Sequence, residues 1–149
     1  MSGDADLIKL YSQRILALSA DIPHQAPLES PQATAKKRSP LCGSTVSVAL
    51  SLEDGKISEY SQDVKACALG QASAAVSGAA IIGRTREEVA RARDQLKAML
   101  KEDGPVPDAP FDGFEVLQPA KDYKNRHASI MLTLDATLDA FDKALEAAA

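Results

Sequence analysis

The chain has 149 residues, which is enough for a single domain (residues 1–149) with a buried core. Its formal net charge is −4, and its one basic cluster, Lys36-Lys37-Arg38, is too short to form a nucleic-acid-binding face. No apolar run approaches the roughly 20 residues of a membrane span, and the N-terminus lacks a signal-peptide pattern. We therefore expect a cytoplasmic protein whose partners include neither nucleic acid nor a membrane.

The first predicted element is an amphipathic helix over about residues 4–20. Its apolar residues recur at helical spacing: Leu7, Leu10, Tyr11, Ile15 and Leu18. Prolines then rule out a regular helix and indicate a surface connection: Pro23, Pro27 and Pro31. His24 lies in this connection and is interpreted as a solvated loop residue.

Strand patterns occupy the next part of the chain. The segment Thr45–Leu52 alternates apolar and polar residues, which is typical of a strand with one buried face. Asp54-Gly55 is a strong hairpin-turn signal and joins this strand to another over about residues 57–65. A further strand is expected over about residues 32–38. Together these patterns predict a small three-stranded antiparallel sheet.

Three helices are predicted after the sheet. The first is Ala-rich, covers about residues 69–82 and ends at Gly83. Thr85 and Glu88 form a capping box that opens the second, which Gly104-Pro105 stops. The third covers about residues 122–146. Apolar residues before it are expected to dock on the core, and its own buried stripe follows: Phe111, Phe114, Val116 and Leu117, then Ile130, Met131, Leu134, Leu138, Phe141 and Leu145. The fold class is α+β, with helices packed on one face of the sheet.

The only two cysteines lie where predicted elements meet. Cys42 stands between a loop and a strand, and Cys67 stands between a strand and a helix. At a helix N-terminus the unpaired amides and the helix dipole favour the thiolate over the thiol. In a reducing compartment such cysteines are metal ligands, nucleophiles or small core residues rather than a disulfide.

His127 is the third residue that suggests a metal site. It shares a helical face with Met131 and Leu134, so it is expected to point toward the core. Alone it is either a buried histidine bonded to a carbonyl or a metal ligand. With Cys42 and Cys67 it would form a Cys₂His set with one open position. That position would be filled by water, by Asp63 or by a partner's ligand.

Other chemistries find no support in the motifs. There is no Gly-rich phosphate loop after a strand and no G-x-S-x-G motif. A Cys–His nucleophile pair is formally open, but nothing in the sequence supplies an orienting group. These motifs leave open whether the chain is an enzyme.

The chain resembles the U-type iron–sulfur cluster assembly scaffolds, the IscU, SufU and NifU N-terminal family. The residues that carry the resemblance are Leu10-Tyr11, Ser39-Pro40-Leu41-Cys42-Gly43, Cys67-Ala68-Leu69-Gly70-Gln71-Ala72-Ser73 and Arg126-His127-Ala128-Ser129. The resemblance implies that Cys42 and Cys67 accept sulfur from a cysteine desulfurase and, with His127, bind iron or zinc. It also implies assembly of a [2Fe–2S] cluster that is passed to apo iron–sulfur proteins. A homodimer that shares a cluster is left open.

Two departures from the family pattern concern the site itself. The aspartate that follows Cys-Gly in the family is Ser44 here. The family's third cysteine is missing, and it aligns with either His127 or Ala128. In the first alignment an imidazole replaces a thiolate, and in the second the histidine that precedes the cysteine is retained.

Three hypotheses follow from the resemblance and its departures. The first is a scaffold or carrier that binds a [2Fe–2S] cluster, or its iron and sulfur precursors, through Cys42, Cys67 and His127. The second is a sulfur acceptor that holds zinc through the same three residues. The third is a degenerate family member that acts as a metal-free interaction module.

Overall fold

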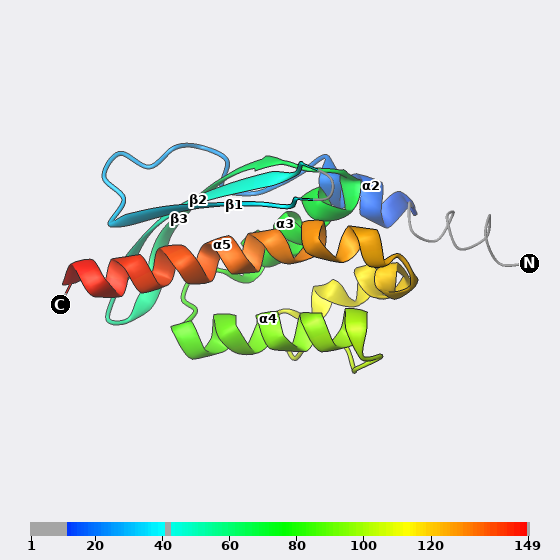
Figure 1. The fold of residues 1–149 in the computed structure, drawn as a ribbon. Helices are drawn as coiled ribbons and strands as arrows, with labels where there is room; N and C mark the ends of the chain where they lie inside the picture. Colours follow the sequence, from blue (N-terminus) through cyan, green and yellow to red (C-terminus); the bar gives the residue numbers. More distant parts are fainter. Residues whose placement is uncertain (1–11, 41–42, 149) are drawn as a thin grey trace, which may run out of the picture.

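The computed structural model of the protein describes residues 12–40 and 43–148 (Figure 1). One helix, three consecutive strands and then a run of helices follow one another along the chain, which is the order predicted for an α+β fold. They are α2 (Gln13–Ser19), β1 (Ala33–Arg38), β2 (Thr45–Glu53), β3 (Lys56–Lys65), α3 (Ala68–Ala80), α4 (Arg86–Lys101), the 3₁₀ helix η1 (Asp112–Asp122) and α5 (Lys124–Ala148).

The three strands form one antiparallel sheet in the order β1-β2-β3. In the register of the sheet, Ala35 lies opposite Val48, and Val46 lies opposite Val64. The β2–β3 turn has positive φ at both Asp54 and Gly55, with values of 54° and 74°. This pair of left-handed residues matches the twist of the two strands, which confirms the hairpin expected from Asp54-Gly55.

Helices cover one face of the sheet, and α5 runs the length of the molecule between the sheet and α4 (Figure 1). The alternating residues Val46, Val48 and Leu50 of β2 are buried on this face. The Tyr60 hydroxyl lies 2.7 Å from Thr137 Oγ1 of α5, and burial raises the pKa of Tyr60 to about 12. Thus α5 is the element that joins both layers.

The capping box that opens α4 is confirmed. Thr85 Oγ1 accepts from the Glu88 amide at 3.2 Å, and Glu88 Oε1 accepts from the Thr85 amide at 3.0 Å. The hydrogen bond that the Thr85 amide donates is also the main cause that lowers the pKa of Glu88. This reciprocal pair fixes where the chain turns from the connection after α3 into α4.

Several predicted boundaries were wrong. The helix expected over residues 4–20 is not continuous, because α2 begins only at Gln13, after Ser12, whose ψ is 164° and whose hydroxyl caps the helix; residues 1–11 lie outside the described part. The last helix begins at Lys124 because the chain before it forms the 3₁₀ helix η1. Leu145 is 41% exposed, because the buried stripe of α5 continues from Phe141 to Ala144 instead.

None of the helices in the described residues combines the length and the apolar character that a membrane span needs.

Candidate metal and sulfur site

Cys67 lies at the N-terminus of α3, at the junction between strand and helix that its sequence context predicts. Its backbone is extended, with φ −67° and ψ 170°, and its side chain makes no capping hydrogen bond. The carbonyl of Cys67 accepts from the Gln71 amide at 2.9 Å, so the residue is already anchored to the first turn of the helix. The half-buried thiol is therefore held at the first turn of α3.

Ser129 of α5 is the side chain that meets this thiol. Its Oγ lies 3.4 Å from Cys67 Sγ, and the residue is only 1% exposed. Gly70 makes the approach possible, because a Cβ at that position would lie 2.6 Å from Ser129 Oγ. One turn further along α3, Ser73 Oγ donates to the Ile130 carbonyl at 2.6 Å and fixes the two helices together.

Ser44 extends this contact to the loop between β1 and β2. Ser129 Oγ donates to Ser44 Oγ at 3.2 Å, and both residues are buried. The loop is closed at its base, because the Ser39 amide donates to the Ser44 carbonyl at 2.8 Å and the Gly43 amide donates to the Ser39 carbonyl at 3.0 Å. We call the three residues Cys67, Ser129 and Ser44 the thiol–hydroxyl chain.

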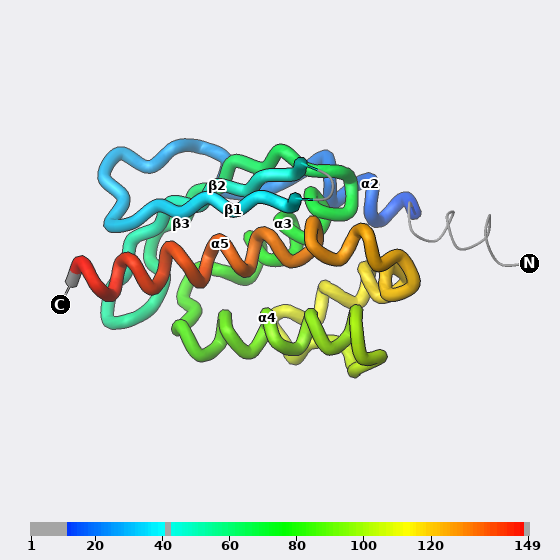
Figure 2. The backbone as a smooth tube through the Cα atoms, in the orientation of Figure 1, coloured from blue at the N-terminus to red at the C-terminus, as the bar shows by residue number. Residues whose placement is uncertain are grey.

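Cys42 lies outside the described residues, so its side chain is not placed. Its neighbours in the sequence are placed: Gly43 has φ 71°, a left-handed conformation that suits glycine, and Ser44 touches Ser129. Figure 2 shows the end of β1, the start of β2, the start of α3 and the start of α5 at the same end of the molecule. The fold therefore brings the chain on both sides of Cys42 to the end that holds Cys67.

His127 is buried near the start of α5, with 3% of its surface exposed. Its Nε2 lies 3.0 Å from the Ala120 carbonyl and 3.1 Å from the Lys121 carbonyl. A carbonyl can only accept, so Nε2 carries a proton, and the lone pair of the neutral ring is on Nδ1. A histidine that binds a metal commonly donates its other N–H to a backbone carbonyl in this way. The arrangement suits either a buried structural histidine or a ligand that acts through Nδ1.

The structure does not gather every predicted ligand into one cluster. His127 and Ser129 are two positions apart on α5, so their side chains leave the helix in directions that differ by roughly 200°. Asp63 is exposed on β3, and its neighbour Gln62 faces α5, where its Oε1 accepts from Thr133; Asp63 therefore points to the other face of the sheet. Within residues 12–40 and 43–148, no group of three or more His, Cys, Asp or Glu side chains forms a metal site.

Ser129 and Gly70 are the site residues that the sequence patterns did not single out. Both lie inside the quoted motifs, Gly70 three positions after Cys67 and Ser129 two positions after His127. A glycine in the first turn of a helix, three positions after a cysteine, is the signal that another side chain approaches closely. Nothing in the sequence identifies that side chain as Ser129.

The fold matches that of known proteins over most of the chain. The family model of the NifU-like N-terminal domain matches residues 10–129. The crystal structure of a nitrogen-fixing NifU-like protein (N-terminal) from Brucella abortus has a TM-score of 0.91 and 42% identity, over 95% of this chain and 98% of that one. A protein from Fervidobacterium islandicum, assigned as an iron–sulfur cluster assembly scaffold for the SUF system, has a TM-score of 0.79 and 20% identity, over 90% and 98%. No curated protein matches the chain. With most of its length matched by the family model, the chain belongs to the NifU-like N-terminal domain family.

Proposed function

We propose that this protein is a scaffold or carrier for iron–sulfur cluster assembly, with iron and sulfide as its cargo. Family membership supports this, and so does the scaffold assignment of the Fervidobacterium protein that shares the fold. The single observation that carries the proposal is the Cys67 thiol at the N-terminus of α3, 3.4 Å from a buried hydroxyl and at the end of the molecule that the Cys42 loop reaches. Its partners would be a cysteine desulfurase as sulfur donor and apo iron–sulfur proteins as recipients.

In this proposal the thiolates of Cys42 and Cys67 are the primary ligands for iron or for a [2Fe–2S] cluster. Thiolate is the ligand that iron–sulfur clusters take most often from proteins. His127 is the third candidate ligand, acting through Nδ1 while Nε2–H stays bonded to the carbonyls of η1. Asp63 points away from α5, so we assign the fourth position to water or to a ligand from a partner.

The same geometry also supports a sulfur-acceptor role. A thiolate at Cys67 would attack the outer sulfur of a persulfide on the desulfurase, forming a new S–S bond and releasing the donor cysteine as its thiolate. Cys67 is half-buried rather than sealed in the core, so the attacking sulfur can be reached. The zinc-bound form of this role would use the same three residues, with zinc in place of iron.

Anaerobic reconstitution with ferrous iron and sulfide tests the scaffold proposal. We expect iron and acid-labile sulfide in matching amounts on each chain, with the visible absorption of a [2Fe–2S] cluster, and loss of both in Cys42→Ser and in Cys67→Ser. Ser77→Ala is the matched control, because Ser77 is a buried hydroxyl on the same helix α3 without a hydrogen-bond partner among the described residues.

The outcomes separate the three roles. Retention of the cluster in both cysteine variants would contradict the scaffold proposal. One zinc per chain in protein purified without a metal-binding tag, together with stimulation of a desulfurase, would favour the sulfur acceptor. Neither metal nor stimulation, with the fold intact by circular dichroism, would favour a metal-free interaction module. His127→Ala and His127→Gln then test the third ligand, because glutamine can donate to the η1 carbonyls but has no ring nitrogen to bind a metal.

A further inference from the structure

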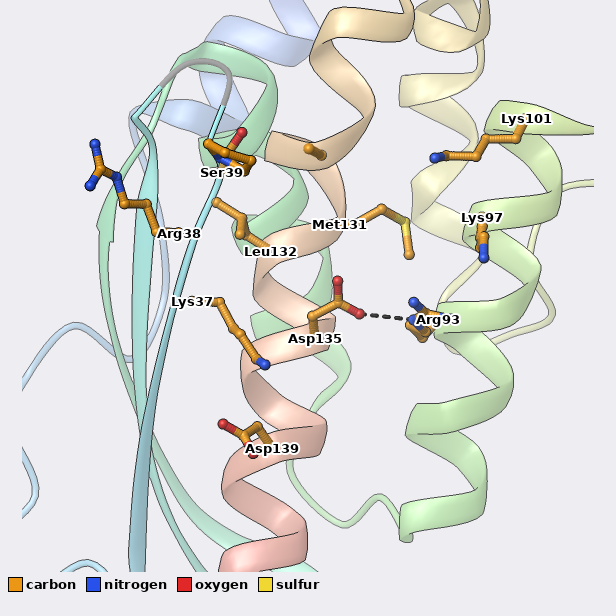
Figure 3. Close-up of a pocket in the computed structure, with 12 residues that line it drawn as sticks. Lys37, Arg38, Ser39, Arg93, Lys97, Lys101, Met131, Leu132, Asp135 and Asp139 are labelled. Atoms are coloured by element: carbon orange, nitrogen blue, oxygen red, sulfur yellow. Dashed lines mark hydrogen bonds and ion pairs between the residues drawn. The ribbon is translucent and has the colours of Figure 1, made fainter.

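A groove with a volume of about 550 Å³ lies between β1 and α4, with α5 as its floor (Figure 3). Its walls carry basic side chains, Lys37 from β1 and Arg93, Lys97 and Lys101 from α4. Met131 and Leu132 of α5 line the floor, each with the 5% of its surface that is exposed. The volume lies within the range of ligand-binding clefts in proteins.

The charges in the groove do not cancel. Arg93 is paired with Asp135 at 2.8 Å, and Asp139 is paired with Lys143 at 3.6 Å. Lys37, Lys97 and Lys101 are exposed, and none of them forms an ion pair with another described residue. These three lysines give the groove a positive potential on a chain whose net charge is −4. Such local asymmetry attracts and orients an acidic partner.

The spacing of the basic residues suits an extended chain. Arg93, Lys97 and Lys101 follow one another at i, i+4 and i+8 on α4, so they are about 6 Å apart along the helix axis. Residues on the same side of an extended strand are about 6.6–6.8 Å apart. An extended segment with an acidic residue at every second position would therefore match this row. Successive side chains of an extended segment point to opposite sides, so apolar residues at the other positions would point away from this row, beside the floor that Met131 and Leu132 line.

The groove ends beside the candidate site. Ser39, Pro40 and Ala128 line it. Pro40 is two residues before Cys42 in the sequence, and Ala128 precedes Ser129, whose hydroxyl touches the Cys67 thiol. A segment that occupies the groove would thus reach the end of the molecule where sulfur or a cluster would be exchanged.

We propose that this groove docks an extended acidic segment of a partner protein, with acidic and apolar residues in alternation. The purpose of such docking rests on the proposed function, because it would hold the partner beside the thiols. The binding itself does not depend on iron or sulfide. It is therefore measured on the metal-free protein, so that a failure to form a cluster and a failure to bind the segment are seen in separate experiments.

The test uses fluorescence anisotropy with a labelled peptide of three Glu-Val repeats. We expect saturable binding at low salt that weakens toward physiological ionic strength, since charges separated by more than about 8 Å are then screened. The double variant Lys97→Glu/Lys101→Glu should weaken binding roughly tenfold or more, because two attractions become repulsions. The matched control is Lys36→Glu/Lys56→Glu, which changes the net charge equally. Lys36 points to the face of β1 opposite to that of Lys37, and Lys56 lies at the start of β3, in the β2–β3 hairpin.

Each other outcome overturns the proposal. Equal weakening in the control variant would show that net charge, not the groove, attracts the peptide. Equal binding of a peptide with three Glu followed by three Val would show that alternation is not recognised. If citrate or pyrophosphate displaced the labelled peptide at the same concentration as the unlabelled peptide does, the groove would be assigned to a small anion. Chemical shifts that move on a face away from β1 and α4 would place the binding elsewhere.

Discussion

The C-terminal half of α5 is held by apolar packing and by a surface ion pair, whereas its first turns carry buried hydroxyl and imidazole groups. Phe141 is fully buried, and Asp142 beside it accepts from Arg86 through both carboxylate oxygens, at 2.5 and 3.2 Å. Near the start of the helix, His127 and Ser129 are just as buried, but one donates to carbonyls and the other contacts a thiol. Both halves of the helix contribute to the core, but only its first turns place buried polar groups at the candidate site.

The largest effect is expected in the C-terminal half of α5. Phe141→Ala should lower the free energy of unfolding by about 3–5 kcal/mol, because it removes a large ring from the core and leaves a cavity. Urea unfolding followed by circular dichroism measures this loss. An effect below about 1 kcal/mol would show that the C-terminal half of α5 contributes little to the core.

Gly70→Ala should disturb the packing between α3 and the first turns of α5. Its Cβ would lie 2.6 Å from Ser129 Oγ and 2.8 Å from Ala66 Cβ, so we expect a loss of about 1–3 kcal/mol in unfolding free energy. The double variant Gly70→Ala/Ser129→Ala tests the cause. If the serine hydroxyl is the main obstacle, the double variant should be more stable than the sum of the single effects predicts, by about 0.5 kcal/mol or more. Additive effects would contradict a direct clash.

Ser129→Ala should change reactivity more than stability. The Ser129 hydroxyl lies 3.4 Å from Cys67 Sγ and can turn from Ser44 to donate to the sulfur, so its loss should slow alkylation of Cys67 by iodoacetamide at pH 7 by about tenfold, since hydrogen bonds to charged groups contribute about 1.5–3 kcal/mol. The measurement is made in a Cys42→Ser background so that only one thiol reacts. Ser77→Ala serves again as the control, and an equal change in both variants would point to a general loosening of α3.

The smallest effect concerns the ion pair between Arg86 and Asp142, in the C-terminal half of α5. The hydrogen bond from Arg86 lowers the pKa of Asp142, so the pair stabilises the fold above the unfolded-state pKa of the carboxyl, and this contribution is lost as the pH falls through the folded-state pKa. Both side chains are more than 40% exposed, so screening keeps the contribution at about 0.2–1 kcal/mol. Asp142→Asn should therefore be slightly less stable than the parent at pH 7, and the difference should vanish in acid. A difference that grew as the pH fell would contradict this assignment.

Local signals predicted most of the fold. The Asp54-Gly55 turn, the capping box of Thr85 and Glu88 and the alternation along β2 each depend on neighbours in the sequence, and each is confirmed. The helix start at Ser12 was missed because the apolar pattern runs past this local cap, and the exposure of Leu145 was missed because tertiary packing decides which side of a helix is buried.

The candidate site was harder to predict than the fold. Cys67 was placed correctly at the start of a helix, because that position follows from the strand and helix patterns around it. Ser129 was missed, since its contact with Cys67 joins residues 62 positions apart in the chain. The expected grouping of Cys42, Cys67 and His127 remains a proposal, and Cys42 lies outside the described residues.

The thiol–hydroxyl chain has a consequence for the charge of the site. A serine hydroxyl has one proton to donate and can rotate, so Ser129 can direct that proton to either of its two neighbours. When Cys67 is a thiol, its S–H can donate to Ser129, which donates to Ser44; when the sulfur is a thiolate, the Ser129 hydroxyl can turn and donate to it instead. A carboxylate at position 44, as the family pattern has it, would compete for that proton and would add a negative charge beside the thiolate. With Ser44 in that place the competitor is neutral, and the rotation of one hydroxyl adapts the contact to either form of the sulfur while the neighbouring heavy atoms keep their positions.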